Sequence, residues 1–233
     1  PLVLSEEELV RVLEAAAPFA ADAGEYTVEA GRPDVFTDEK LQLLKDYGVT
    51  RICVNPQSFC DATLERIGRR HTSADIYRAY EMAQKFGFDV NFDLIAGLTG
   101  ETCEEFEESV DRAIALSPEN ITVHTLCLKK GAQLKEEESF LNVERIQEMI
   151  AYSRERLSQS GYVPYYMYRQ KYMAGNCENT GWTKPGKACV YNVDVMEEIT
   201  DNLACGANAV DKKIFPHEGR IERQGAPKDI PTY

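Results

Sequence analysis

The chain has 233 residues, 43% hydrophobic and 28% charged, which is the composition of one large globular domain or one and a half small ones. Its 26 Lys and Arg residues against 39 Asp and Glu residues give a formal net charge of −13, which argues against nucleic acid and membrane surfaces as partners. No segment has the pattern of a membrane span or of a secretory signal. The seven cysteines match neither a disulfide framework nor a zinc site. We therefore expect a cytoplasmic protein with reduced thiols and with no metal ligands in this chain.

Helical patterns and short apolar strands alternate over the first part of the chain. Two capping boxes, Ser5 with Glu8 and Thr102 with Glu105, each predict the start of a helix, and the first helix is expected to end near Ala20. The other predicted elements are helices over 37–48 and 73–87 and strands over 26–29, 51–54, 90–96 and 121–126.

A helix separates each predicted strand from the next, which indicates repeated right-handed βαβ units and therefore a parallel sheet or barrel. We expect an α/β fold, with a partial parallel (β/α) barrel over residues 1–135 and an α+β extension over 136–233. Because a helix precedes the first strand, earlier barrel strands are expected upstream. The alternative is a true N-terminus on an open sheet.

The last third of the chain has a different pattern. A polar helix over 143–160 is followed by a tyrosine-rich stretch over 162–172, a loop that contains the only tryptophan, Trp182, and an apparent hairpin over 213–222. We expect these segments to form an antiparallel extension packed beside the barrel.

Four polar residues fall near the carboxyl ends of the predicted strands, where ligands bind in parallel α/β folds. They are Glu29, Gln57, Asp93 and His124. Asp93 interrupts a buried run, so it needs a firm hydrogen-bond or ligand role. Each residue also has a structural interpretation: Glu29 as a cap, Asp93 as an acceptor for backbone N–H groups, and the other two as satisfied barrel-end residues.

Six ordered segments together resemble a known family. Four are VEAGRP at 28–33, NPQSF at 55–59, IGRRHT at 67–72 and NFDLIAGL at 91–98, and two later ones are YRQKYMAGN at 168–176 and KPGK at 184–187. In this order they are similar to the oxygen-independent coproporphyrinogen III oxidases, also called coproporphyrinogen dehydrogenases, which are radical S-adenosylmethionine (SAM) enzymes.

The resemblance implies positions for cofactor and substrate. It assigns Glu29 to the SAM bound at an iron–sulfur cluster and places a neighbouring SAM position among Gln57, Arg69, Asp93, Cys127 and Val210. Arg169, Lys171, Lys184 and Lys187 are the expected groups for the carboxylates of a tetrapyrrole substrate, next to aromatic faces of the tyrosine-rich stretch. Alternating tyrosines are also an ordinary amphipathic strand surface.

The implied activity is oxidative decarboxylation of coproporphyrinogen III to protoporphyrinogen IX in haem biosynthesis, with SAM, a [4Fe–4S] cluster and an electron donor. The family holds its cluster on a CxxxCxxC motif, and no cysteines of this chain have that spacing. We therefore expect the cluster ligands upstream and the fragment by itself to be inactive. The alternatives are a haem chaperone-like relative without decarboxylase activity, and a generic barrel enzyme acting on a small anionic substrate.

Overall fold

The computed structural model describes residues 1–127, 142–169 and 176–232. The chain divides into two compact units, Pro1–Ala188 and Cys189–Tyr233, and each is described by itself. None of the described helices is both long and apolar enough to cross a bilayer.

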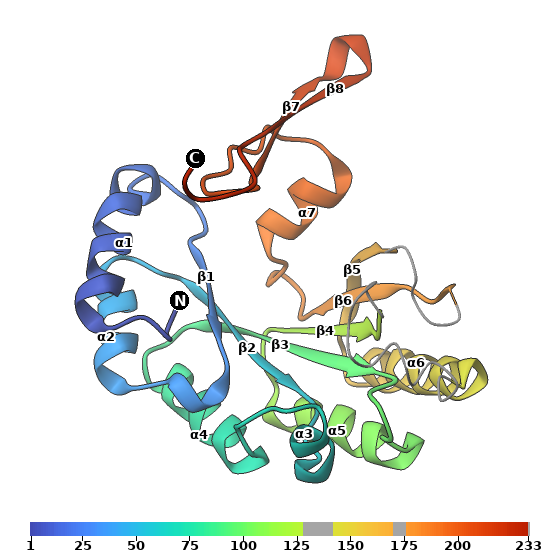
Figure 1. The fold of residues 1–233 in the computed structure, drawn as a ribbon. Helices are drawn as coiled ribbons and strands as arrows, with labels where there is room; N and C mark the ends of the chain where they lie inside the picture. The colour runs from blue at the N-terminus through green and yellow to red at the C-terminus, as the bar shows by residue number, and fades with distance from the viewer. Residues whose placement is uncertain (128–141, 170–175, 233) are drawn as a thin grey trace. The chain divides into compact units, whose positions relative to one another are not determined.

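A six-stranded sheet in the order β1-β2-β3-β4-β6-β5 forms the centre of the first unit (Figure 1). Its strands are β1 (Thr27–Gly31), β2 (Arg51–Gln57), β3 (Asp89–Ala96), β4 (Asn120–Thr125), β5 (Val163–Tyr168) and β6 (Asn179–Thr183). The first four strands are parallel neighbours, and β6 runs antiparallel to both β4 and β5. The expected α/β class with a mostly parallel sheet is confirmed.

The helices of the first unit are α1 (Glu6–Ala20), α2 (Asp38–Asp46), α3 (Asp61–Arg66), α4 (Ser73–Lys85), α5 (Cys103–Leu116) and α6 (Val143–Gln159). Both predicted capping boxes are present, and a third one joins Thr72 to Asp75 at the start of α4. The short helix α3 was not predicted, because its six residues are too few to show a helical period.

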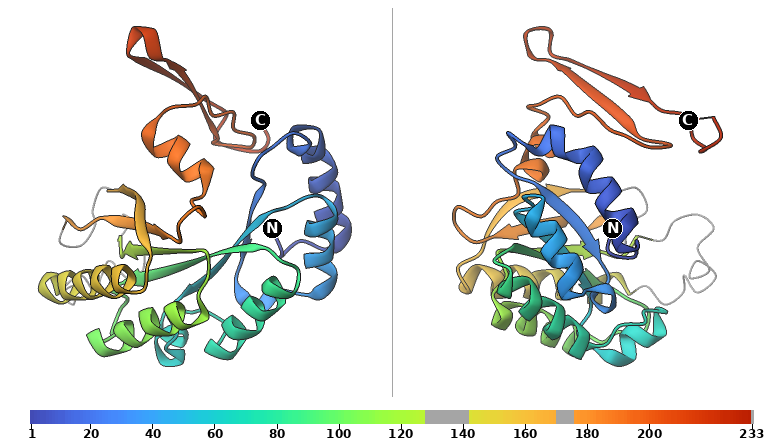
Figure 2. Two further views of the ribbon diagram at one scale, coloured as in Figure 1. Left: turned by 180° about the vertical axis from the view of Figure 1, so that it is seen from behind. Right: turned by 90° about the vertical axis from the view of Figure 1, so that its left-hand side faces the viewer.

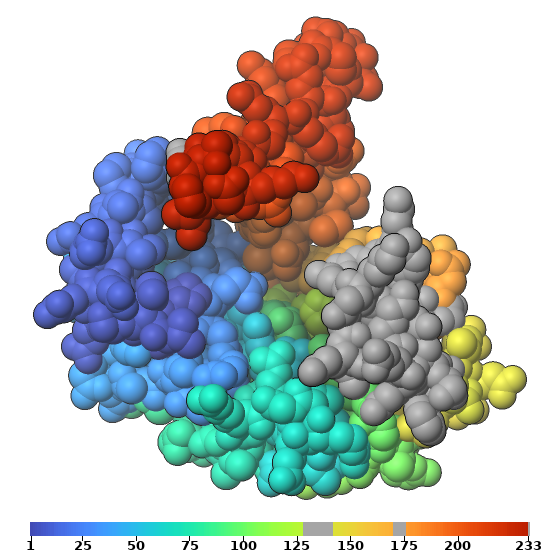
Figure 3. All heavy atoms as spheres, in the orientation of Figure 1, coloured from blue at the N-terminus to red at the C-terminus, as the bar shows by residue number. Residues whose placement is uncertain are grey.

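Helices cover one face of the curved sheet, as the two views in Figure 2 show. This outer face carries the apolar residues of each strand, among them Ile52, Phe92 and Ile121, which are fully buried in the hydrophobic core. In the space-filling view the atoms of α1 and α2, drawn in blue, lie together at the surface (Figure 3). Because side chains alternate along a strand, the remaining residues point to the opposite, inner face.

The inner face is polar, unlike the interior of a sheet that is apolar on both sides. It carries Cys53, Asn91 and Thr122 in mid-sheet, and all three are at least nine-tenths buried. The residues at its amino end, Arg51 and Asn120, are buried as well. Buried polar side chains must satisfy one another, so this face is organised by hydrogen bonds.

Arg51 ties together the amino ends of the parallel strands. Its guanidinium lies 3.2 Å from Glu25, which precedes β1, and 3.7 Å from Asp89, the first residue of β3. It also donates to Asn120 at the start of β4 and to the carbonyl of Lys187, which follows β6. A side chain only 5% exposed thus joins five chain segments at one end of the sheet.

The predicted division at residue 135 lies outside the described residues, and the compact units divide instead between Ala188 and Cys189. The two divisions differ because β6 is hydrogen-bonded to β4 along its length, so that β5 and β6 continue the main sheet. The expected extension is therefore split, its first strands belonging to the sheet and its last 45 residues, Cys189–Tyr233, to the second unit.

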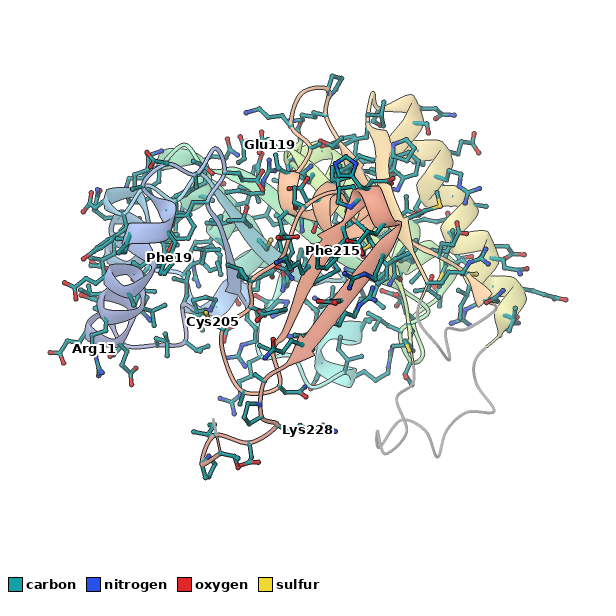
Figure 4. All side chains as sticks on the ribbon, turned by 90° about the horizontal axis from the view of Figure 1, so that it is seen from above. Arg11, Phe19, Glu119, Cys205, Phe215 and Lys228 are labelled. Carbon is teal, nitrogen blue, oxygen red and sulfur yellow. The ribbon has the colours of Figure 1, made fainter. Side chains whose placement is uncertain are left out.

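The second unit contains helix α7 (Val190–Glu197) and the antiparallel hairpin β7 (Val210–Phe215) and β8 (Arg220–Gly225). The hairpin is confirmed, with longer strands than predicted, whereas α7 was not predicted. Phe215 lies on this hairpin (Figure 4), and the Arg220 guanidinium lies 3.9 Å from its ring centroid.

Replacing Arg51 by Met is expected to lower the free energy of unfolding by about 3–5 kcal/mol, because it removes a buried guanidinium that interacts with Glu25, Asp89 and Asn120. Urea denaturation of the purified chain measures this. The control is Arg78→Met: Arg78 is 59% exposed and pairs with Asp75 on the surface, so its loss should change stability by no more than about 0.5 kcal/mol. Equal effects of the two changes would contradict the structural role of Arg51.

Candidate functional site

The carboxyl ends of the parallel strands bring several predicted site residues to one edge of the sheet. Gln57 is the last residue of β2 and lies in register with Leu94, directly next to Asp93 on β3. Asp93 in turn lies opposite Thr122 on β4, and Cys127 follows that strand by two residues. Glu29 lies near the end of β1 and is exposed. Strand register therefore places Gln57, Asp93 and Cys127 on or just after neighbouring strands, and their role in binding a cofactor stays a prediction.

Asp93 points to the inner face, with its side chain 17% exposed. Its Oδ1 accepts a hydrogen bond of 2.8 Å from Asn91 Nδ2 and lies 3.6 Å from Nε2 of His124. On the other side of the ring, the Tyr168 hydroxyl lies 3.5 Å from His124 Nδ1. Asp93 is thus neither a backbone cap nor fully buried, and it forms a polar group with Asn91, His124 and Tyr168 on the inner face.

Gln57 adopts a left-handed backbone conformation, with φ of 70°. A non-glycine residue there is strained, and such strain persists only where neighbouring contacts enforce it. His71 supplies one contact, since its Nε2 donates to the Pro56 carbonyl at 3.0 Å. Ser58 supplies the other: its hydroxyl donates to the Glu101 carboxyl group at 2.6 Å. Gln57 is therefore held on both sides.

His71 also connects Gln57 to the segment that carries Arg69. Burial lowers the pKa of His71, so the ring is neutral at pH 7 and Nε2 carries the proton that bonds Pro56. Desolvation lowers the pKa of Arg69, and the nearby Arg32 guanidinium lowers it further while Asp34 opposes this. Arg32 pairs with Asp34 at 3.1 Å, and no ion pair within 4 Å joins Arg69 to a described carboxylate, so this corner of the sheet edge suits a ligand carboxylate.

Glu101 is fully buried after the turn that follows β3. Burial raises its pKa to about 7, although the hydrogen bond from Ser58 acts in the opposite direction. Its Oε2 has no hydrogen-bond partner among the described residues, which also favours the protonated form. Through its bond to Ser58, Glu101 therefore connects the end of β2 to the start of α5, and its carboxyl group is partly protonated at pH 7.

The predicted substrate residues are placed elsewhere. Lys184 pairs with Glu119 before β4, and Lys187 pairs with Asp89 at the start of β3, so both lie at the amino end of the sheet, where Figure 4 labels Glu119. Arg169 follows β5 and pairs with Glu178 at 2.6 Å. The fourth predicted substrate residue, Lys171, lies outside the described residues. Val210, which was predicted for the SAM position, lies in the second unit.

Sequence reasoning missed several residues that hold this edge together. His71 lies inside the family-like segment at 67–72 and Glu101 stands next to the capping box at Thr102, but nothing in their spacing shows that they contact Pro56 and Ser58. Tyr168 and His124 were noted separately. Their contact depends on the antiparallel strands β6 and β5 following β4 in the sheet, an order that local patterns do not reveal.

Comparison with known proteins identifies the class. The profile of the radical SAM superfamily matches residues 1–113. The E. coli coproporphyrinogen III oxidase HemN, described as a radical SAM enzyme, has a similar fold: its solved structure superposes with a TM-score of 0.71 at 20% identity, over 91% of this chain and 50% of HemN.

Sequence relatives narrow the group. The oxygen-independent coproporphyrinogen-III oxidase-like protein HemZ of Bacillus subtilis is 39% identical over 97% of this chain and 45% of its own length. The haem chaperone HemW of E. coli is 29% identical over 88% of the chain and 51% of its own length. The chain carries a radical SAM domain and is homologous to the HemZ and HemN coproporphyrinogen III oxidase family. It spans about half the length of these curated relatives.

The described residues fit the two cofactors of this family differently. Carboxylate, amide and guanidinium groups at the sheet edge suit the hydroxyl, ammonium and carboxylate groups of SAM. In the described part of the chain, no three His, Cys, Asp or Glu side chains are grouped closely enough to hold a metal ion, so these residues do not supply the ligands of an iron–sulfur cluster.

Gln57→Gly is expected to be more stable than Gln57→Ala by about 1 kcal/mol, because only glycine adopts a φ of 70° without strain. Thermal or urea denaturation compares the two. The matched control is the pair Thr180→Gly and Thr180→Ala on β6, where an ordinary strand conformation should make the alanine variant the more stable. The same order at both positions would rule out backbone strain at Gln57.

Glu101→Gln is expected to remove a pH-dependent contribution to stability. The pKa of Glu101 is raised from 4.5 to about 7 in the folded protein, so its contribution is complete below about pH 4.5 and is lost as the pH rises through 7. Wild type should therefore lose on the order of 3 kcal/mol relative to Glu101→Gln over this range. Urea denaturation of both proteins between pH 4.5 and 8 measures the difference, and a constant difference would contradict the raised pKa.

Proposed function

We propose that this chain forms one wall of a SAM pocket in a radical SAM protein whose substrate or cargo is a tetrapyrrole. The observation that carries the proposal is the placement of Asp93. Its carboxylate is oriented by Asn91 on the polar inner face, one residue before Leu94, the sheet partner of Gln57, and no described residue donates to its Oδ2. An open carboxylate oxygen at the carboxyl edge of a parallel sheet accepts hydrogen bonds from a ligand hydroxyl or ammonium group.

The other pocket residues have complementary chemistry. Arg69, with Arg32 beside it, suits the methionine carboxylate of SAM, and Gln57 and the backbone at Cys127 suit its polar and adenine groups. The exposed Glu29 would face the SAM that is bound at a cluster. SAM supplies radical chemistry at such a cluster, and the residues of this chain would bind and orient it.

The finer activity that we propose is oxidative decarboxylation of coproporphyrinogen III to protoporphyrinogen IX, with an electron donor outside this chain. Among the described basic residues, we assign Arg169, which is exposed just after β5, to a substrate carboxylate. Lys184 and Lys187 form ion pairs at the opposite end of the sheet and are not assigned to the substrate. Haem binding without decarboxylation is the second candidate, because the haem chaperones HemW are also relatives.

S-adenosylhomocysteine, which needs no cluster chemistry, tests the pocket on the chain itself. Isothermal titration calorimetry is expected to detect binding to wild type and at least a tenfold loss in Asp93→Ala, because a hydrogen bond to a charged group contributes roughly 1.5–3 kcal/mol. The control Asp38→Ala removes a half-exposed carboxylate that pairs with Lys85 on another surface, and should bind like wild type. Absence of binding to wild type would overturn the proposal.

A protein extended to the full length of the curated relatives and reconstituted with iron and sulfide separates the two activities. Protoporphyrinogen formation with release of 5′-deoxyadenosine supports the decarboxylase. Stoichiometric haem binding and transfer, without turnover of coproporphyrinogen III, supports the chaperone instead.

A further inference from the structure

A chain of hydrogen bonds crosses the inner face of the sheet and ends at Asp93. It begins at Tyr166 on β5, whose hydroxyl lies 3.2 Å from the Thr122 hydroxyl on β4. Thr122 Oγ1 donates to Asn91 Oδ1 at 3.1 Å, and Asn91 Nδ2 donates to Asp93 Oδ1 at 2.8 Å. Three strands of the sheet thus contribute to the orientation of one carboxylate.

The direction of this chain follows from the chemistry of its members. An ionised carboxylate only accepts, so Asn91 must present its NH2 group to Asp93 and its carbonyl oxygen to Thr122. Thr122 then uses its single proton on Asn91, which leaves its lone pairs for the Tyr166 hydroxyl. Burial raises the pKa of Tyr166, which keeps the hydroxyl protonated and able to donate. Every donor therefore points toward Asp93.

Gly181 on β6 makes the first step of the chain possible. It pairs with Thr122 in the sheet, and a Cβ atom added to it would lie 1.8 Å from Cε1 of Tyr166. The tyrosine ring therefore crosses β6 in the space above this glycine and reaches Thr122 on the next strand. The ring of Tyr168, which contacts His124, lies parallel to that of Tyr166, with a centroid separation of 6.3 Å.

We propose that Thr122 and Asn91 are positioning residues for the SAM pocket, and that Tyr166 and Gly181 complete the relay through which they act. The hydroxyl of Thr122 fixes the orientation of the Asn91 amide, and the amide fixes Asp93 with Oδ2 open to a ligand donor. This inference rests on the proposed function for the identity of the ligand. The relay itself is a property of the protein without ligand and is tested separately.

The first experiment follows the Asn91 side-chain NH2 signals by NMR in the ligand-free chain. In Thr122→Val these signals are expected to shift and to exchange faster with water, because the amide loses the donor that orients it. Two matched controls remove buried hydroxyls that bond backbone carbonyls elsewhere: Thr183→Val, which loses a bond to Lys184, and Tyr162→Phe, which loses a bond to Pro118. Unchanged Asn91 signals in Thr122→Val, or equal shifts in the controls, would overturn the relay.

The second experiment is a double-mutant cycle on S-adenosylhomocysteine affinity. Thr122→Val is expected to weaken binding roughly threefold to tenfold, the value of one hydrogen bond, and to have no further effect in an Asp93→Ala background. Additive losses would show that Thr122 acts on general stability and would refute the positioning role. If wild type does not bind the probe, the proposed function and this role at the pocket both fail, whereas the NMR result still decides whether the relay exists.

Discussion

The arrangement of the main sheet depends on Arg51. Charges buried in a protein interior are tolerated only when each is paired and hydrogen-bonded, and here one guanidinium satisfies Glu25, Asp89 and Asn120 together with the carbonyl of Lys187. These partners belong to the amino ends of successive strands and to the segment after β6. One guanidinium therefore holds the amino ends of these strands together. The register of the strands in turn determines which residues lie side by side at the opposite end of the sheet.

The carboxyl end of the sheet shows the consequence of this register. Gln57 is strained and held from both sides by His71 and Glu101, and Asp93 is oriented through Asn91. These supports come from the turn after β3, the segment before α4 and the inner face. Side chains held by several independent elements have little conformational freedom left to lose, which is the property that a preorganised pocket needs.

The antiparallel strands of this radical SAM-type sheet also contact the polar residues of its inner face. β6 and β5 extend the parallel sheet, and through Tyr166 and Tyr168 they contact the residues around Asp93. These two tyrosines therefore connect the antiparallel strands to the polar residues at the carboxyl end of the inner face.

The sequence by itself determined the parallel α/β order, the capped helices and the edge at which Glu29, Gln57 and Asp93 gather, because helix caps and apolar periodicity are local and strand ends in parallel sheets always meet. It did not reveal that Lys184 and Lys187 lie at the amino end of the sheet, or that the chain divides after Ala188. The contacts of His71, Glu101 and Tyr166 were equally invisible. These features depend on which strands pair across long sequence separations, and only the tertiary structure decides that pairing.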